Sequence, residues 1–153
     1  MSVGAGPKLV VVDASLASMW VLREPHSALA LALAAEWARA GVEAIAPCFM
    51  VAEVTSALYK RVRRGELALE DARRALDVVL GFGVRLDEEP ELHRRALVLA
   101  HRLDRPTPYD AHCLALAELR GWELWTGDER LYNAVRAALP WVRWVGAYTP
   151  SGS

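Results

Sequence analysis

Cysteine and lysine are both scarce in this chain of 153 residues, and each scarcity argues against a class of site. The two cysteines, Cys48 and Cys113, lie far apart in apolar helical stretches without C-x-x-C spacing. A zinc or thiol-redox site is therefore disfavoured, and both are predicted to be small core residues. A phosphoacceptor-aspartate site needs a lysine that follows one of the later strands of the sheet. The two lysines of this chain, Lys8 and Lys60, do not occupy such a position. Receiver domains and related phosphatases are therefore disfavoured.

The sequence also lacks a membrane-spanning run, a secretory signal and a glycine-rich phosphate-binding loop. No apolar run reaches the roughly 18 uncharged residues that cross a bilayer. The opening MSVGAGP contains neither the basic segment nor the long apolar segment of a secretory signal. No glycine-rich loop follows the first predicted strand, which argues against a nucleotide-binding site. We therefore expect a cytoplasmic protein without membrane contact.

Short β-branched runs alternate with longer amphipathic segments along the chain. The predicted strands are residues 8–13, 42–47, 84–88, 122–126 and 141–146. The predicted helices are residues 15–22, 26–40, 48–65, 67–83, 90–104, 109–120 and 127–139. Strands that alternate with helices of this length form βαβ units, whose parallel sheet is covered on both faces.

The predicted fold class is therefore α/β: a three-layer α/β/α sandwich with a central, mainly parallel sheet of four to five strands. The hydrophobic content of 54% suffices for a sizeable core. Because no repeat or low-complexity linker divides the sequence, we expect one domain over residues 1–153. Residues 1–7 and 147–153 are expected to be flexible tails.

The segment TPYDAHCLALAE, residues 107–118, combines a buried helix with a carboxylate. After Pro108 the helix is apolar on nearly every side, which is typical of a helix inside a protein. Asp110 lies near its start, one turn before Cys113 and Leu114 on the same side. Burying an unpaired carboxylate costs several kcal/mol or makes it take up a proton. Asp110 therefore requires a partner.

Three other acids are predicted to lie at the same edge of the sheet. Asp13 ends the first strand, Asp128 follows the fourth, and Glu53 lies in the helix after Pro47. In a parallel sheet the strands end and the helices begin at one edge, where binding sites form. Each aspartate also has a simpler interpretation. Asp13 and Asp128 could cap helices, and Asp110 could complement a helix dipole.

Glu53 and the clustering of the acids favour a metal site. The helical neighbours of Glu53, such as Met50 and Ala57, belong to a face that should be buried. A solvated glutamate is therefore not expected at this position. Carboxylates that share a cavity raise each other's pKa unless a cation lies among them, and Mg²⁺ or Mn²⁺ suits oxygen ligands. His112 lies two residues from Asp110 and so points roughly to the other side of the helix, which disfavours zinc.

Four motifs together resemble those of the PIN-domain ribonucleases: VVVDAS, PCFMVAEVTSALYKRVRRG, TPYDAHCLALAE and LWTGDERL. The similarity covers nearly the whole chain, in order and at the family's spacing. It is greatest to the toxins of VapBC-type toxin–antitoxin pairs. Each motif is short, but the four together are specific. The resemblance implies a three-layer α/β/α fold and Mg²⁺- or Mn²⁺-dependent cleavage of RNA.

The resemblance also implies roles for particular residues. The acids that match its catalytic, metal-binding carboxylates are Asp13, Glu53, Asp110 and Asp128. Of these, Glu53 would be a further ligand or a water-mediated contact. Ser15, two residues after the first acid, and Thr126, two before the last, match small hydroxyl residues that orient ligands or the attacking water.

Two positions depart from the family pattern. Gly127 stands where alanine is commoner, which we expect to be harmless. The helix after Asp128 offers only Asn133 where some members carry an additional acid. Because no core acid is missing, we expect an active enzyme. The alternative is a non-catalytic PIN-like module that binds RNA or protein.

Partners follow from the same resemblance. An acidic site cannot hold RNA alone, and the net charge of −1 supplies no general attraction, so local basic residues must do so. The candidates are Lys60, Arg61, Arg63, Arg64, Arg102, Arg105 and Arg130. A solvated helix face is the simpler alternative for each. The resemblance further implies a small antitoxin protein and a homodimer, for which Trp20 or Trp37 is a candidate contact.

Overall fold

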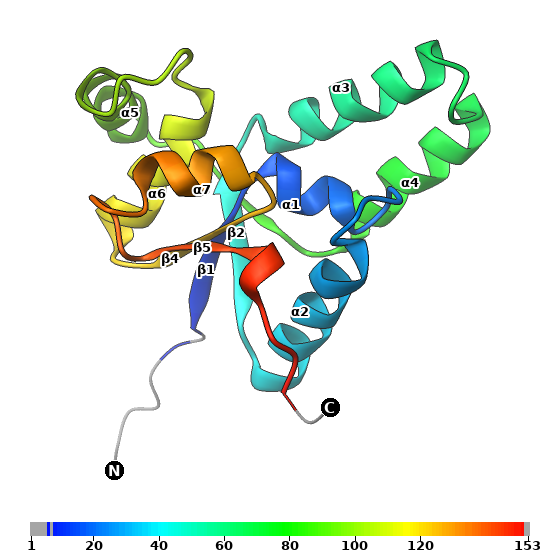
Figure 1. Ribbon diagram of the computed structural model, residues 1–153, viewed down its shortest axis with the longest axis horizontal. Helices are drawn as coiled ribbons and strands as arrows, with labels where there is room; N and C mark the ends of the chain where they lie inside the picture. Colours follow the sequence, from blue (N-terminus) through cyan, green and yellow to red (C-terminus); the bar gives the residue numbers. More distant parts are fainter. Residues whose placement is uncertain (1–5, 7, 152–153) are drawn as a thin grey trace.

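The structure is a computed structural model that describes residue 6 and residues 8–151. In this part of the chain, helices and strands alternate (Figure 1). The strands are β1 (Leu9–Val12), β2 (Glu43–Pro47), β3 (Arg85–Asp87), β4 (Glu123–Thr126) and β5 (Val142–Trp144). The helices are α1 (Ala14–Met19), α2 (Ser27–Ala40), α3 (Met50–Arg63), α4 (Leu69–Gly81), α5 (Pro90–Arg102), α6 (Tyr109–Arg120) and α7 (Glu129–Val135). A 3₁₀ turn at Val145–Ala147 follows β5.

The five strands form one parallel sheet in the order β3-β2-β1-β4-β5. Strand β1 pairs with β2 on one side and with β4 on the other, so the sheet grows outward from β1 in two directions. The carboxyl ends of β1 and β4 therefore lie side by side where the winding direction changes, which is where open α/β sheets bind ligands. The predicted α/β/α sandwich with a mainly parallel sheet of four to five strands is confirmed.

Each face of the sheet has its own hydrophobic core, because successive side chains of a buried strand point to opposite faces. Val10 and Val12 of β1 belong to a core with α1, α2, α3 and α4, whereas Val11 belongs to a core with α5, α6 and α7. Figure 1 shows the two groups of helices on opposite sides of the sheet. Helix α6 is buried from Ala111 to Ala117, as its apolar sequence predicts.

Trp20 and Trp37 both lie in the core, with exposed fractions of 6% and 9%. The ring of Trp20 stacks on Phe82, and that of Trp37 meets the ring of Trp125 edge to face. The expectation that Trp20 or Trp37 offers a surface contact to a partner is therefore wrong, because both rings are used in packing. Cys113 is buried as expected.

The sequence predicts tails at both ends of the chain. Residues 1–5, 7 and 152–153 lie outside the described residues. Within residues 147–151, the ring of Tyr148 packs against Trp125, and its hydroxyl donates a hydrogen bond to Glu36. The Ser151 hydroxyl donates a second one at 2.8 Å. This segment therefore lies against β4 and α2. No helix of the described part is long and apolar enough to span a membrane.

Candidate active site

Asp13 follows β1 directly and caps helix α1. Its Oδ1 accepts hydrogen bonds from the Leu16 backbone N–H at 2.9 Å and from the Ser15 hydroxyl at 2.7 Å. Its Oδ2 accepts a hydrogen bond from the Thr126 hydroxyl at the end of β4. Burial, with 8% of the residue exposed, raises the pKa of Asp13. The three hydrogen bonds oppose this rise, and the negative charge of Asp128 adds to it.

Ser15 and Thr126 connect α1 to the turn between β4 and α7. The Ser15 Oγ lies 3.2 Å from the Thr126 Oγ1 and accepts a hydrogen bond from the Gly127 N–H at 2.9 Å. The Thr126 hydroxyl oxygen accepts one from the Asp128 N–H at 2.9 Å. A Cβ on Gly127 would lie 2.7 Å from the Met19 Cε and 3.0 Å from the Ser15 carbonyl carbon. An alanine at 127 would therefore crowd Met19 and the backbone of α1, whereas the glycine of this chain fits the turn.

Asp128 caps helix α7, and its negative charge acts on Asp13. Its Oδ1 accepts hydrogen bonds from the backbone N–H groups of Arg130 at 2.9 Å and Leu131 at 3.1 Å. Its Oδ2 has no hydrogen-bond partner in the described part of the chain. The simpler interpretation as a helix cap therefore holds for both aspartates, but in Asp128 it uses one of the two carboxylate oxygens.

Asp110, in the first turn of α6, has Arg105 as its partner. The Arg105 Nε donates a hydrogen bond to Oδ2 at 3.0 Å, and Nη2 lies 2.9 Å from the same oxygen. The other oxygen, Oδ1, is buried and has no hydrogen-bond partner among the described residues. Arg105, whose side chain is 15% exposed, was a candidate RNA contact, but it is already paired with this carboxylate.

The end of helix α5 directs Arg105 toward Asp110. Asp104 adopts φ 51°, the left-handed conformation in which glycine is more usual. The Arg105 N–H then donates a hydrogen bond to the Ala100 carbonyl at 2.8 Å, and the Asp104 N–H to that of His101 at 3.2 Å. These two bonds form a Schellman motif, which turns the chain back toward α6.

Glu53 lies in the first turn of α3 and is half-buried. Burial, together with the negative charges of Asp13 and Asp110, raises its pKa to about 7. Burial also raises the pKa of the Cys113 thiol, and the charges of Asp13, Glu53 and Asp110 add to this rise. Glu53 and Cys113 therefore both experience the charge of the aspartates.

The chemistry of these side chains suits a hard divalent cation. All four are carboxylates, and the orphaned Oδ1 of Asp110 is an oxygen that burial would penalise without a cation. His112 is already used, since its ring nitrogens lie 2.6 Å from the Pro108 carbonyl oxygen and 3.0 Å from His93. As the side chains stand, the described residues include no group of three or more His, Cys, Asp or Glu that encloses a metal position.

Comparison with known proteins assigns the fold to a family. A family model for the PIN domain matches residues 10–137. The chain belongs to the PIN domain family. No curated protein matches this PIN domain. It is similar in structure to PAE2754 from Pyrobaculum aerophilum, with 26% sequence identity, 92% of each chain covered and a TM-score of 0.62.

A second similar structure is that of Mycobacterium tuberculosis VapC20, described as a toxin that cleaves the sarcin–ricin loop. Its sequence identity to this PIN domain is 19%, with a TM-score of 0.62. The match covers 82% of this chain and 94% of that one. At this identity the likeness shows a shared fold.

The predicted basic residues separate into groups around this PIN domain. Arg102 pairs with Glu118 at 3.5 Å. Lys60, Arg61 and Arg64 line a groove that begins at Glu53. The remaining candidates, Arg63 and Arg130, are exposed and line no part of this groove. The same holds for Asn133 in α7.

Proposed function

We propose that this PIN domain is a Mg²⁺- or Mn²⁺-dependent endoribonuclease and the toxin of a toxin–antitoxin pair. The observation that carries the proposal is the position of the four acids. Asp13 and Asp128 follow two neighbouring strands, and the charges of Asp13 and Asp110 both act on Glu53. The Oδ1 atom of Asp110 is buried and has no hydrogen-bond partner among the described residues. Such a cluster is costly unless a cation joins it.

In the proposed site, Asp13, Asp110 and Asp128 hold the metal, and Glu53 is a further ligand or a contact through water. A divalent cation there supplies a water of lowered pKa and neutralises charge that develops on the scissile phosphate. The two aspartates with an unused oxygen, Asp110 and Asp128, present it as a ligand. Ser15 and Thr126 fix the orientation of the Asp13 carboxylate through their hydroxyl groups.

Membership of the PIN domain family supports the nuclease activity, since the family consists of nucleases. The described activity of VapC20 supports RNA as the substrate. By the same similarity the proposal includes a small antitoxin protein, a homodimer and a cytoplasmic location. The alternative, a PIN-like module that binds RNA or protein without cleavage, differs from it in one respect, namely whether metal-dependent cleavage occurs.

The test is cleavage of labelled structured RNAs, including a sarcin–ricin stem-loop and mixed transfer RNA, with Mn²⁺, with Mg²⁺ and with EDTA. We expect wild type to cleave with metal. Asp110→Asn should cleave at least 100-fold more slowly while thermal unfolding shows that it is still folded. Asp77→Asn, which changes an exposed aspartate of α4, should cleave at the wild-type rate. Cleavage by Asp110→Asn at the wild-type rate would reject the site. RNA binding without cleavage in any metal would favour the binding module.

A further inference from the structure

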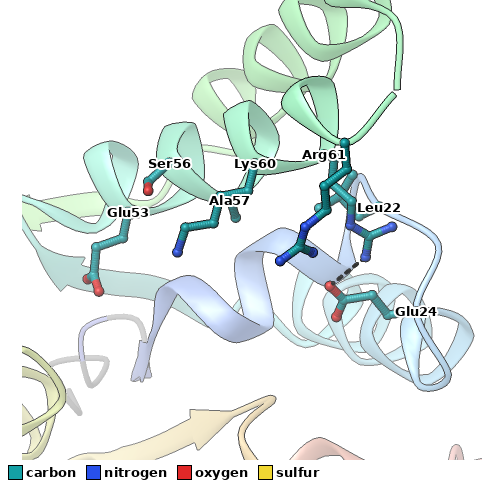
Figure 2. A pocket seen from close by; sticks show the side chains of 8 residues that line it. Leu22, Glu24, Glu53, Ser56, Ala57, Lys60 and Arg61 are labelled. Atoms are coloured by element: carbon teal, nitrogen blue, oxygen red, sulfur yellow. Dashed lines mark hydrogen bonds and ion pairs between the residues drawn. The ribbon is translucent and has the colours of Figure 1, made fainter. Parts of the chain in front are cut away.

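A groove of about 400 Å³ runs from Glu53 along one face of helix α3 (Figure 2). Its lining residues are Leu22, Glu24, Glu53, Ser56, Ala57, Lys60, Arg61 and Arg64. Along α3, the spacings of three and four residues place these side chains in one stripe. Figure 2 shows Glu53 at one end of the groove, Lys60 beyond it and Arg61 with Glu24 at the other end. The groove thus leads from the acids to a basic region.

The cations of this groove are not equally available to a ligand. Arg61 is paired with Glu24 at 3.4 Å and with Glu66 at 3.6 Å. Lys60 and Arg64 are exposed, and neither has an acidic partner in the part of the chain that the structure describes. Two uncompensated positive charges therefore follow Glu53 along the groove.

We propose that Lys60 and Arg64 bind phosphates of the RNA strand on one side of the scissile bond. This inference rests on the proposed ribonuclease function. At about 1.5 Å per residue, Lys60 lies about 10 Å and Arg64 about 16 Å beyond Glu53 along the helix axis. A stacked strand rises about 3.4 Å per nucleotide, so these side chains meet phosphates a few nucleotides from the acids. There they offset the repulsion between the acid cluster and the RNA.

A structural role must be separated from this one. Basic residues in the last turn of a helix complement its dipole, and Lys60, Arg61 and Arg63 all lie in the last turn of α3. Arg63 is exposed and has no ion pair among the described residues, but it does not line the groove. Arg63→Ala is therefore a matched control for Lys60→Ala and Arg64→Ala.

The experiment measures binding of a fluorescein-labelled single-stranded RNA by fluorescence anisotropy, in Mg²⁺ and over a series of salt concentrations. All variants carry Asp110→Asn, so that the RNA stays intact, and thermal unfolding shows that each is folded. We expect Lys60→Ala and Arg64→Ala each to weaken binding about three- to tenfold. Each should also reduce the slope of log K against log salt by about 0.7. Arg63→Ala should change neither quantity.

Two outcomes overturn the assignment: an equal loss of affinity in all three variants, or unchanged affinity for Lys60→Ala and Arg64→Ala. Cleavage by the protein with Asp110 intact, measured in parallel, keeps this result separate from the proposed function. Affinity that depends on Lys60 and Arg64 without any cleavage would support the groove and reject the nuclease. Cleavage with unchanged affinity in both variants would support the nuclease and reject the groove.

Discussion

The two carboxylate oxygens of Asp110 have different surroundings. Arg105 neutralises Oδ2, whereas Oδ1 is buried without a partner among the described residues. This difference sets the orientation of the side chain, because the guanidinium contacts one oxygen with two nitrogens. Arg105 therefore serves Asp110 as a positioning residue and as a counter-charge.

Replacing Arg105 by glutamine should lower the free energy of unfolding by about 1–3 kcal/mol in the absence of metal, because a largely buried carboxylate loses its cation. Saturating Mg²⁺ should restore part of this loss. Urea denaturation with and without Mg²⁺ measures both effects. The same substitution in an Asp110→Asn background is the control, where the loss should be smaller. Equal losses in the two backgrounds would mean that Arg105 acts by packing alone.

The pKa of Glu53 makes stability depend on pH. Because the folded pKa of about 7 exceeds the ordinary value of 4.5, the folded state holds the proton more tightly between these two values. The free energy of unfolding of the metal-free protein should therefore fall as pH rises from 4.5 to 7. After allowance for solvent screening, the loss relative to Glu53→Gln is on the order of 1–2 kcal/mol.

Urea denaturation in EDTA at pH 5 and pH 8 measures this difference. Glu88→Gln, which changes an exposed glutamate after β3, should follow the wild-type pH profile. If the free energy of unfolding of Glu53→Gln depends on pH as that of wild type does, then Glu53 lies farther from Asp13 and Asp110 in solution than in the structure.

At the scale of elements, the turn between β4 and α7 has to approach α1 closely. The Thr126 and Ser15 hydroxyl groups and the Gly127 N–H meet there, and Gly127 leaves room for Met19. The side chain of Asp13 depends on this approach, because it accepts hydrogen bonds from both hydroxyl groups.

Gly127→Ala should therefore lower the free energy of unfolding by about 1–3 kcal/mol through crowding, and reduce cleavage through displacement of Ser15. Chemical denaturation and the RNA cleavage assay test the two parts. Gly81→Ala is the matched control, since its Cβ would meet no atom within 4 Å and its backbone suits alanine. A Gly127→Ala variant as stable and active as wild type would show that the turn is free to move.

At the scale of the whole molecule, the acids join the two halves of the fold. Asp13 caps α1 and Glu53 lies in α3, and both helices belong to one layer. Asp110 lies in α6 and Asp128 caps α7, and these two helices belong to the opposite layer. Their mutual repulsion acts between these halves, so a cation that binds them should stabilise the entire domain.

Mn²⁺ at ten times its dissociation constant should raise the midpoint of thermal unfolding by about 3–6 °C. Differential scanning fluorimetry in Mn²⁺ and in EDTA measures this shift without any RNA. Asp128→Asn should show a smaller shift, and Asp77→Asn the wild-type one. If all three proteins respond alike, Mn²⁺ binds elsewhere.

Much of this architecture follows from the sequence itself. Hydrophobic periodicity predicts the five strands, the buried helix α6 and the parallel sheet, because these depend on local patterns of polarity. The presence of Asp13, Glu53, Asp110 and Asp128 at one edge follows as well, since parallel strands all end there.

Other features required the tertiary structure, because they depend on distances between side chains from separate elements. The sequence does not show that β4 lies beside β1, that Arg105 pairs with Asp110, or that Gly127 touches α1. It also leaves Trp20 and Trp37 as surface candidates, although packing buries both. Periodicity reports which face of an element is apolar, whereas the partner of a particular atom is decided by the packing of the whole chain.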